Sequence, residues 1–252
     1  MKRVALTVSI SLTAFIVAAV IAHSRGQHQY EKHLGAQGWT LKRTVNFTPV
    51  GGEPRIVGRE EVYFAADGRH RKDIFSMDDE GKEFCPLSTI FIPGIGVFNE
   101  NSKNQTLMYV ADNGAFVVDV NIKQLRSDPN YIGDQEILGY KCAIFRTTLN
   151  DGSVMESYDA YQLGRYTLKS ISRDNEGVQI WEPTSIEIGP VSESEFMYNN
   201  KWPVDFSEFE KRIQRVQSIS VSDQNAAKEL NSMRQQLEQA KQRFSAQGYT
   251  IK

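Results

Sequence analysis

Apolar and polar residues alternate along the stretch Val178-Gln179-Ile180-Trp181-Glu182-Pro183-Thr184-Ser185-Ile186-Glu187-Ile188. One parity holds four aliphatic residues, interrupted twice by polar ones: Val178, Ile180, Ile186 and Ile188, with Glu182 and Thr184 between them. A period of two residues is typical of a β-strand that has one face in the core and one face in water. The stretch therefore predicts a strand of an antiparallel sheet.

Similar short runs, rich in Val, Ile, Phe, Tyr and Thr, extend outward from this stretch over about residues 39–199, with turns between them. Each turn places Gly after Asp, Asn or Glu, where a tight turn needs a positive φ. The turns are Ala66-Asp67-Gly68, Asp79-Glu80-Gly81, Asp112-Asn113-Gly114, Asn150-Asp151-Gly152 and Asn175-Glu176-Gly177, and the third is flanked by 107–111 and 115–120 as a hairpin. Strands and helices do not alternate, so the pattern predicts an antiparallel meander of roughly eight to eleven strands rather than a parallel sheet.

The end of the chain has a helical period instead. From Asp223 the apolar residues recur in steps of 4, 3, 4, 3 and 4, at Ala226, Leu230, Met233, Leu237, Ala240 and Phe244. This spacing predicts an amphipathic helix with one narrow apolar stripe, capped by Asp223 and ended by Gly248. Two interpretations are open: the stripe packs on the protein's own surface, or residues 223–245 dock a protein partner or a second copy.

The start of the chain predicts export. Lys2 and Arg3 precede residues 4–22, which carry no charge, and Val20-Ile21-Ala22 fits a signal-peptidase site. The favoured interpretation is a cleaved signal peptide, and the alternative is an uncleaved N-terminal anchor. Both place the rest of the chain outside the cytoplasm, in the periplasm or an equivalent compartment and near a membrane.

The expected organisation therefore has four parts: 1–22 is the signal peptide or anchor, 23–38 a lead-in, 39–206 the β domain and 207–252 a helical tail. With 40% hydrophobic and 24% charged residues, the 252-residue chain is typical of a globular protein. Its net charge of −2 gives no overall basic field for nucleic acid.

The sequence favours a non-enzymatic protein without catalytic residues, metal site or cofactor. It contains no CxxC, no HExxH and no GxSxG motif. A pair of carboxylates for glycoside hydrolysis stays open, because such partners meet only in space.

Three groups of residues are candidates for a site or a crosslink. The most apolar internal stretch has Pro93, Gly94 and Gly96, which argue against a regular strand, and we expect a lid over an apolar cavity formed by Ile90, Phe91, Ile92, Ile95, Val97 and Phe98. The basic run Arg69-His70-Arg71-Lys72 gives a headgroup site at Arg69, Arg71 and Lys72, or else a charged strand that blocks edge pairing. In an oxidising compartment Cys85 and Cys142 either form a disulfide or stay as free thiols.

Four segments, in order along residues 40–206, resemble bacterial envelope proteins with the lipoprotein-carrier (LolA-like) fold, in an uncharacterised branch. The most specific segment is Gly133-Asp134-Gln135-Glu136-Ile137-Leu138-Gly139-Tyr140-Lys141-Cys142-Ala143-Ile144-Phe145-Arg146. The others are Val62-Tyr63-Phe64 through Arg69–Asp73, Tyr161–Lys169, and Ile186–Gly189 followed by Glu195-Phe196.

The resemblance implies an α+β fold, mainly antiparallel β: a sheet curled into a half barrel whose open side is closed over an apolar cavity. Members of the group carry lipoproteins or lipids or sense the state of the envelope. The basic run and the 90–98 stretch match no functional element of the carrier, and the C-terminal helix is an addition, so a lipoprotein cargo is not transferred. We expect an exported domain that binds a lipid or other acylated ligand on the concave face of the sheet. The alternative is an interaction or sensor module that uses the C-terminal helix.

Overall fold

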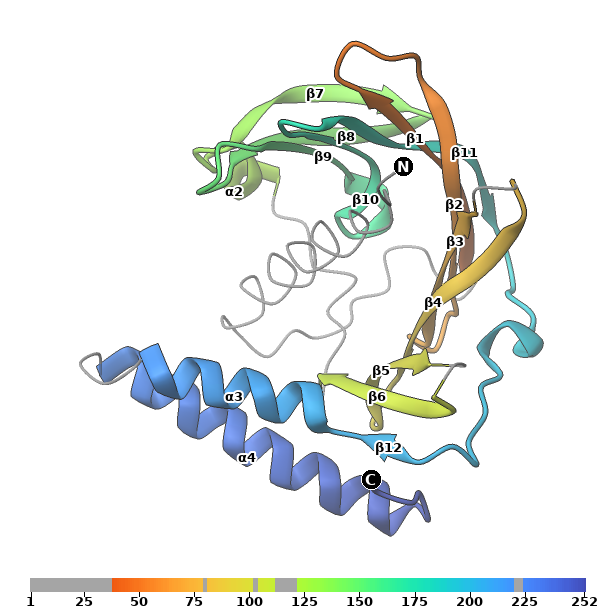
Figure 1. Ribbon diagram of the computed structural model, residues 1–252. Helices are drawn as coiled ribbons and strands as arrows, with labels where there is room; N and C mark the ends of the chain where they lie inside the picture. Colours follow the sequence, from red (N-terminus) through yellow and green to blue (C-terminus); the bar gives the residue numbers. More distant parts are fainter. Residues whose placement is uncertain (1–37, 79–80, 102–103, 112–121, 220–223) are drawn as a thin grey trace, which may run out of the picture.

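The computed structural model describes residues 38–78, 81–101, 104–111, 122–219 and 224–252 (Figure 1). Its strands are β1 (Trp39–Pro49), β2 (Arg55–Phe64), β3 (His70–Met77), β4 (Glu83–Ile92), β5 (Gly96–Asn101), β6 (Thr106–Ala111), β7 (Tyr131–Ile137), β8 (Tyr140–Thr148), β9 (Val154–Ala160), β10 (Tyr166–Arg173), β11 (Gly177–Ile188) and β12 (Val204–Asp205). Its helices are α2 (Ile122–Arg126), α3 (Ser207–Ile219) and α4 (Gln224–Ala246), with 3-10 turns η2 (Tyr161–Leu163) and η3 (Glu193–Phe196).

The described strands form one sheet in the order β12-β6-β5-β4-β3-β2-β1-β11-β10-β9-β8-β7. Neighbouring strands pair antiparallel, except that β12 lies parallel to β6. The stretch 178–188 lies in β11, which pairs with β1 along its whole length. The predicted antiparallel sheet is therefore confirmed. Its edge strands β7 and β12 are not paired with each other, so the sheet is open and does not close into a barrel.

Tight turns connect the strands where the sequence predicts them. Gly68, Gly81, Gly152 and Gly177 all have positive φ. At Gly177 a Cβ would also lie 2.2 Å from the carbonyl oxygen of Thr48 in the neighbouring strand, so both the backbone angle and the space require glycine. Asp79 and Glu80 of the second predicted turn, the turn at 112–114 and the strand expected at 115–120 lie outside the described residues.

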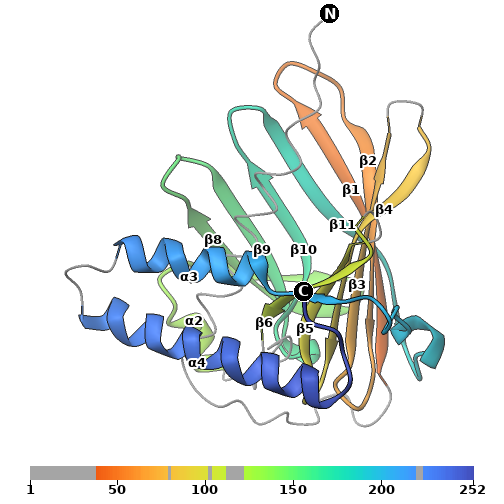
Figure 2. The same ribbon diagram turned by 60° about the horizontal axis from the view of Figure 1, so that its bottom comes forward.

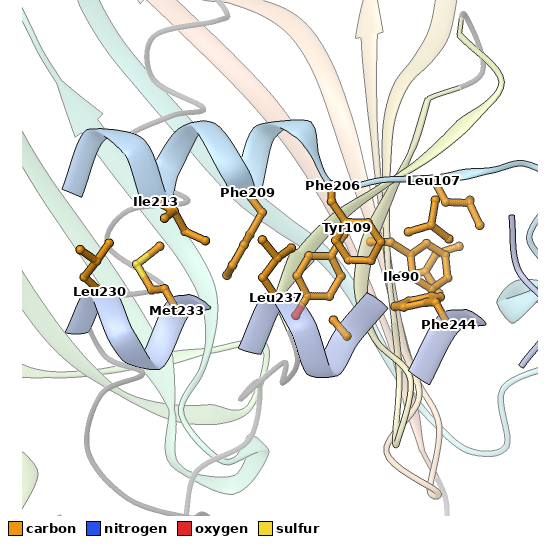
Figure 3. Packing of buried hydrophobic residues seen from close by; sticks show 13 residues of the cluster. Ile90, Leu107, Tyr109, Phe206, Phe209, Ile213, Leu230, Met233, Leu237 and Phe244 are labelled. Carbon is orange, nitrogen blue, oxygen red and sulfur yellow. The ribbon is translucent and has the colours of Figure 1, made fainter. Parts of the chain in front are cut away.

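The helices α3 and α4 pack against each other and against β4–β6 and β12 (Figure 2). The apolar stripe of α4 faces this contact, since Leu230, Met233, Leu237, Ala240 and Phe244 are at most 7% exposed. Figure 3 shows Leu230 and Met233 facing α3, and Phe244 beside Ile90 of the sheet. The first interpretation of the stripe is therefore correct for Leu230 to Phe244, and docking of a partner or a second copy by residues 223–245 stays a prediction.

The predicted end of this helix is confirmed, because Gly248, two residues after the last helical residue Ala246, has a φ of +84°. The expected cap Asp223 lies outside the described residues. The helix α3 lies within the predicted helical tail, and its apolar residues Phe209 and Ile213 join the same cluster as the stripe. Among the described residues no helix combines the length and the apolarity needed to cross a bilayer, and residues 1–22 are not among them.

Candidate functional site

A row of directly opposed residues crosses six neighbouring strands, close to the same end of each strand. The registers pair Ile188 with Trp39, Trp39 with Phe64, Phe64 with His70, His70 with Phe91 and Phe91 with Val97. Residues directly opposite each other on adjacent strands present their side chains on the same face. These six residues, from β11 to β5, are called the apolar row below.

Aromatic rings hold the middle of the apolar row together. Trp39 stacks on Phe64 with ring centroids 5.4 Å apart, and Tyr166 meets Trp39 edge-on at 4.9 Å. The His70 ring lies 6.2 Å from both Phe64 and Tyr166. Contacts of this kind contribute about 0.5–1.5 kcal/mol each beyond the area that they bury, so this part of the row is preorganised.

The apolar row is accessible at its β11 end. Trp39, Phe91 and Val97 are at most 4% exposed, whereas Phe64 is only partly buried and Ile188 is 41% exposed. Ile186 pairs with Leu41, two residues after Trp39 on β1. It is partly buried and packs against the hydrophobic cluster that contains Trp39 and Leu41. The row is thus a continuous series of mostly buried side chains that reaches solvent at Ile188.

Two ionisable side chains, His70 in the row and Tyr166 beside it, stay uncharged near neutral pH. Burial, with a smaller contribution from the nearby charge of Lys72, lowers the pKa of His70 to about 3. Burial also raises the pKa of the Tyr166 hydroxyl above its usual value, although Arg43 opposes that effect. Both side chains are therefore neutral at physiological pH, which suits a surface for apolar groups better than one for proton transfer.

We expect His70 to make the stability of the fold depend on pH. In the unfolded chain its pKa is 6.5, and in the folded chain it is about 3. Because the unfolded state then binds more protons, stability is complete above pH 6.5 and falls as the pH drops toward 3, by up to about 1.4 kcal/mol per pH unit. Urea unfolding of the wild type and of His70→Gln between pH 6.5 and 5 measures this slope, which the variant should lose. Equal slopes in the two proteins would show that His70 is not buried in its neutral form.

A buried ion pair lies farther along the same strands. Arg43 donates hydrogen bonds to the carboxylate of Glu60 and, at 2.9 Å, to the carbonyl oxygen of Thr167. The side chains of Arg43 and Glu60 are 5% and 3% exposed. Two charges that neutralise each other in this way limit the cost of burying them. Among the described residues, no group of three or more His, Cys, Asp and Glu side chains is placed to hold a metal ion.

The expected lid is a β-hairpin instead of a loop. Residues 83–92 form β4 and 96–101 form β5, and the Pro93-Gly94 turn between them has its positive φ of +77° at Gly94. Successive residues of a strand point to opposite faces. Consequently Phe91 and Val97 lie in the apolar row, while Ile90 and Phe98, with the partly buried Ile92 and Ile95, pack on the cluster of α3 and α4. The six residues therefore do not share one surface, and contact with a ligand stays a prediction for Phe91 and Val97.

The basic run also divides between two faces. Arg69 binds Asp67 and, through both terminal nitrogens at 2.6 Å, Glu193, and its guanidinium lies over the ring of Phe196. Arg71 binds Asp73 and Ser88 and donates to the carbonyl oxygen of Met197 at 2.7 Å. Lys72 pairs with Val62 and Thr89 on the face of the apolar row.

The two arginines therefore fasten the η3 connection to β3 and β4. Carboxylates already balance their charges, so a headgroup site at Arg69 and Arg71 has no support in this arrangement. Headgroup binding stays a prediction for Lys72.

The disulfide prediction is wrong. Cys142 in β8 is a free, buried thiol, and burial raises its pKa to about 12. Cys85 lies in β4, and six strands separate β4 from β8 in the sheet order. Adjacent strands are about 4.8 Å apart, and a disulfide requires Cα atoms within about 7 Å, so these strands are too far apart along the sheet.

The structure also places in or beside the row four residues that the sequence did not mark as site residues, namely Trp39, Phe64, Tyr166 and Ile188. The alternation in 178–188 identifies the strand that carries Ile188, but it does not identify the strands that pair with that strand. Trp39 follows Gly38 at the start of the first strand of the domain, and this position was the only signal for it. The apolar row becomes visible only when the register of the strands is known.

No protein family model matches this sequence, and no curated protein matches it. Among solved structures, the complex of MucA and MucB from Pseudomonas aeruginosa is 15% identical, with a TM-score of 0.36, over 64% of this chain and 56% of that one. The chain thus spans little more than half of the length of that relative.

A LolA superfamily protein from Nitrosomonas europaea is 8% identical, with a TM-score of 0.33, over 66% of this chain and 92% of that one. An outer membrane lipoprotein-sorting protein domain from Vibrio parahaemolyticus is 9% identical, with a TM-score of 0.25, over 72% and 94%. Each of these matches is a distant structural likeness, in line with the resemblance that the sequence suggests.

Proposed function

We propose that the protein is an exported, non-enzymatic domain that holds a lipid or another acylated ligand along the apolar row. The observation that supports this most directly is the continuity of the row: six strands contribute opposed residues to one face of the sheet, and its β11 end is exposed at Ile188. Five interstrand spacings of about 4.8 Å give the row a length of about 24 Å, which suits an extended chain.

The binding energy in this proposal comes from burial of the ligand's methylene groups. Each one buried against the row contributes about 0.8 kcal/mol. The long helices α3 and α4 do not compete for this surface, since they pack on Ile90 and Phe98, whose side chains point to the other face of β4 and β5. The ligand enters at Ile188 and Phe64, where the row is most exposed.

Native mass spectrometry of protein purified without detergent tests the proposal. We expect an added mass that matches an acylated molecule. We also expect the emission of an apolar fluorescent probe to rise when the probe binds the protein and to fall again when the ligand displaces it. A clean apo mass, together with no gain in probe emission, would contradict it.

Ile188→Asp is expected to weaken binding of the apolar probe at least tenfold. The substitution removes an apolar side chain from the open end and puts a carboxylate where the ligand must displace water, at a cost of about 1.5–3 kcal/mol. Ile132→Asp is the matched control, because Ile132 is 47% exposed but lies on β7, outside the row. Titration of the probe into both variants is the measurement, and equal affinities would place the ligand elsewhere.

A further inference from the structure

No further inference is drawn: the strongest candidate, the patch of exposed apolar side chains Val50, Ile56, Met77 and Phe84 at the adjacent ends of the β1–β2 and β3–β4 hairpins, carries nothing because no observation on the described residues shows what covers it.

Discussion

Phe244→Ala is expected to lower the free energy of unfolding by about 3–5 kcal/mol, measured by urea denaturation. Phe244 is fully buried, and its ring lies 6.1 Å from Tyr109, 6.0 Å from Phe206 and 5.3 Å from Tyr249. It therefore joins α4 to β6 and to the residue before α3 (Figure 3), and also to the C-terminal segment. The truncation leaves a cavity that three different elements line, and these cannot all move to fill it.

Ser245→Ala is the control for this substitution, because Ser245 is the next residue on α4 and is exposed. Its effect should stay within about 0.5 kcal/mol. A loss below about 1 kcal/mol in Phe244→Ala would mean that the tail folds independently of the sheet and that the cluster shared by α3, α4 and β4–β6 contributes little to stability.

Glu60→Leu is expected to have a comparable effect, a loss of about 3–5 kcal/mol, because it leaves the Arg43 charge buried without its carboxylate. Both side chains are almost completely inaccessible, and Arg43 keeps only its bond to the carbonyl oxygen of Thr167. Urea denaturation at neutral pH measures the difference.

The double variant Arg43→Met with Glu60→Leu separates the cost of an unpaired charge from the loss of packing. Replacing both members of a buried pair with apolar residues of similar size is often close to neutral, so the double variant should recover most of the stability that Glu60→Leu loses. A double variant that is no more stable than Glu60→Leu would show that the ion pair itself stabilises the sheet.

The strands and helices whose pattern is set by residues close together in the sequence were predictable from the sequence. The alternation in 178–188 identifies β11, and the spacing from Leu230 to Phe244 identifies α4 and the face that it buries. Pro93 and Gly94, by contrast, led to the wrong prediction of a lid loop at 90–98. They form a tight turn between two regular strands, whereas in the sequence they suggest an irregular loop.

The candidate site was not predictable in the same way, because it depends on which strands are neighbours. Trp39 and Ile188 come from the first and the eleventh strand, and nothing near either residue indicates that they face each other. The same lack of strand order produced the wrong disulfide between Cys85 and Cys142. It also concealed that Arg69 and Arg71 meet the connection at 193–197.

The most direct test of the proposed function is to map where an acylated ligand binds. The protein is loaded with a photoactivatable fatty acid, irradiated and digested, and the crosslinked peptides are identified by mass spectrometry. We predict crosslinks in β1, β2 and β11, at peptides that contain Trp39, Phe64 and Ile188, and their loss in Ile188→Asp. Crosslinks confined to α3 and α4, or distributed over the surface without preference, would contradict the assignment of the apolar row as the ligand site.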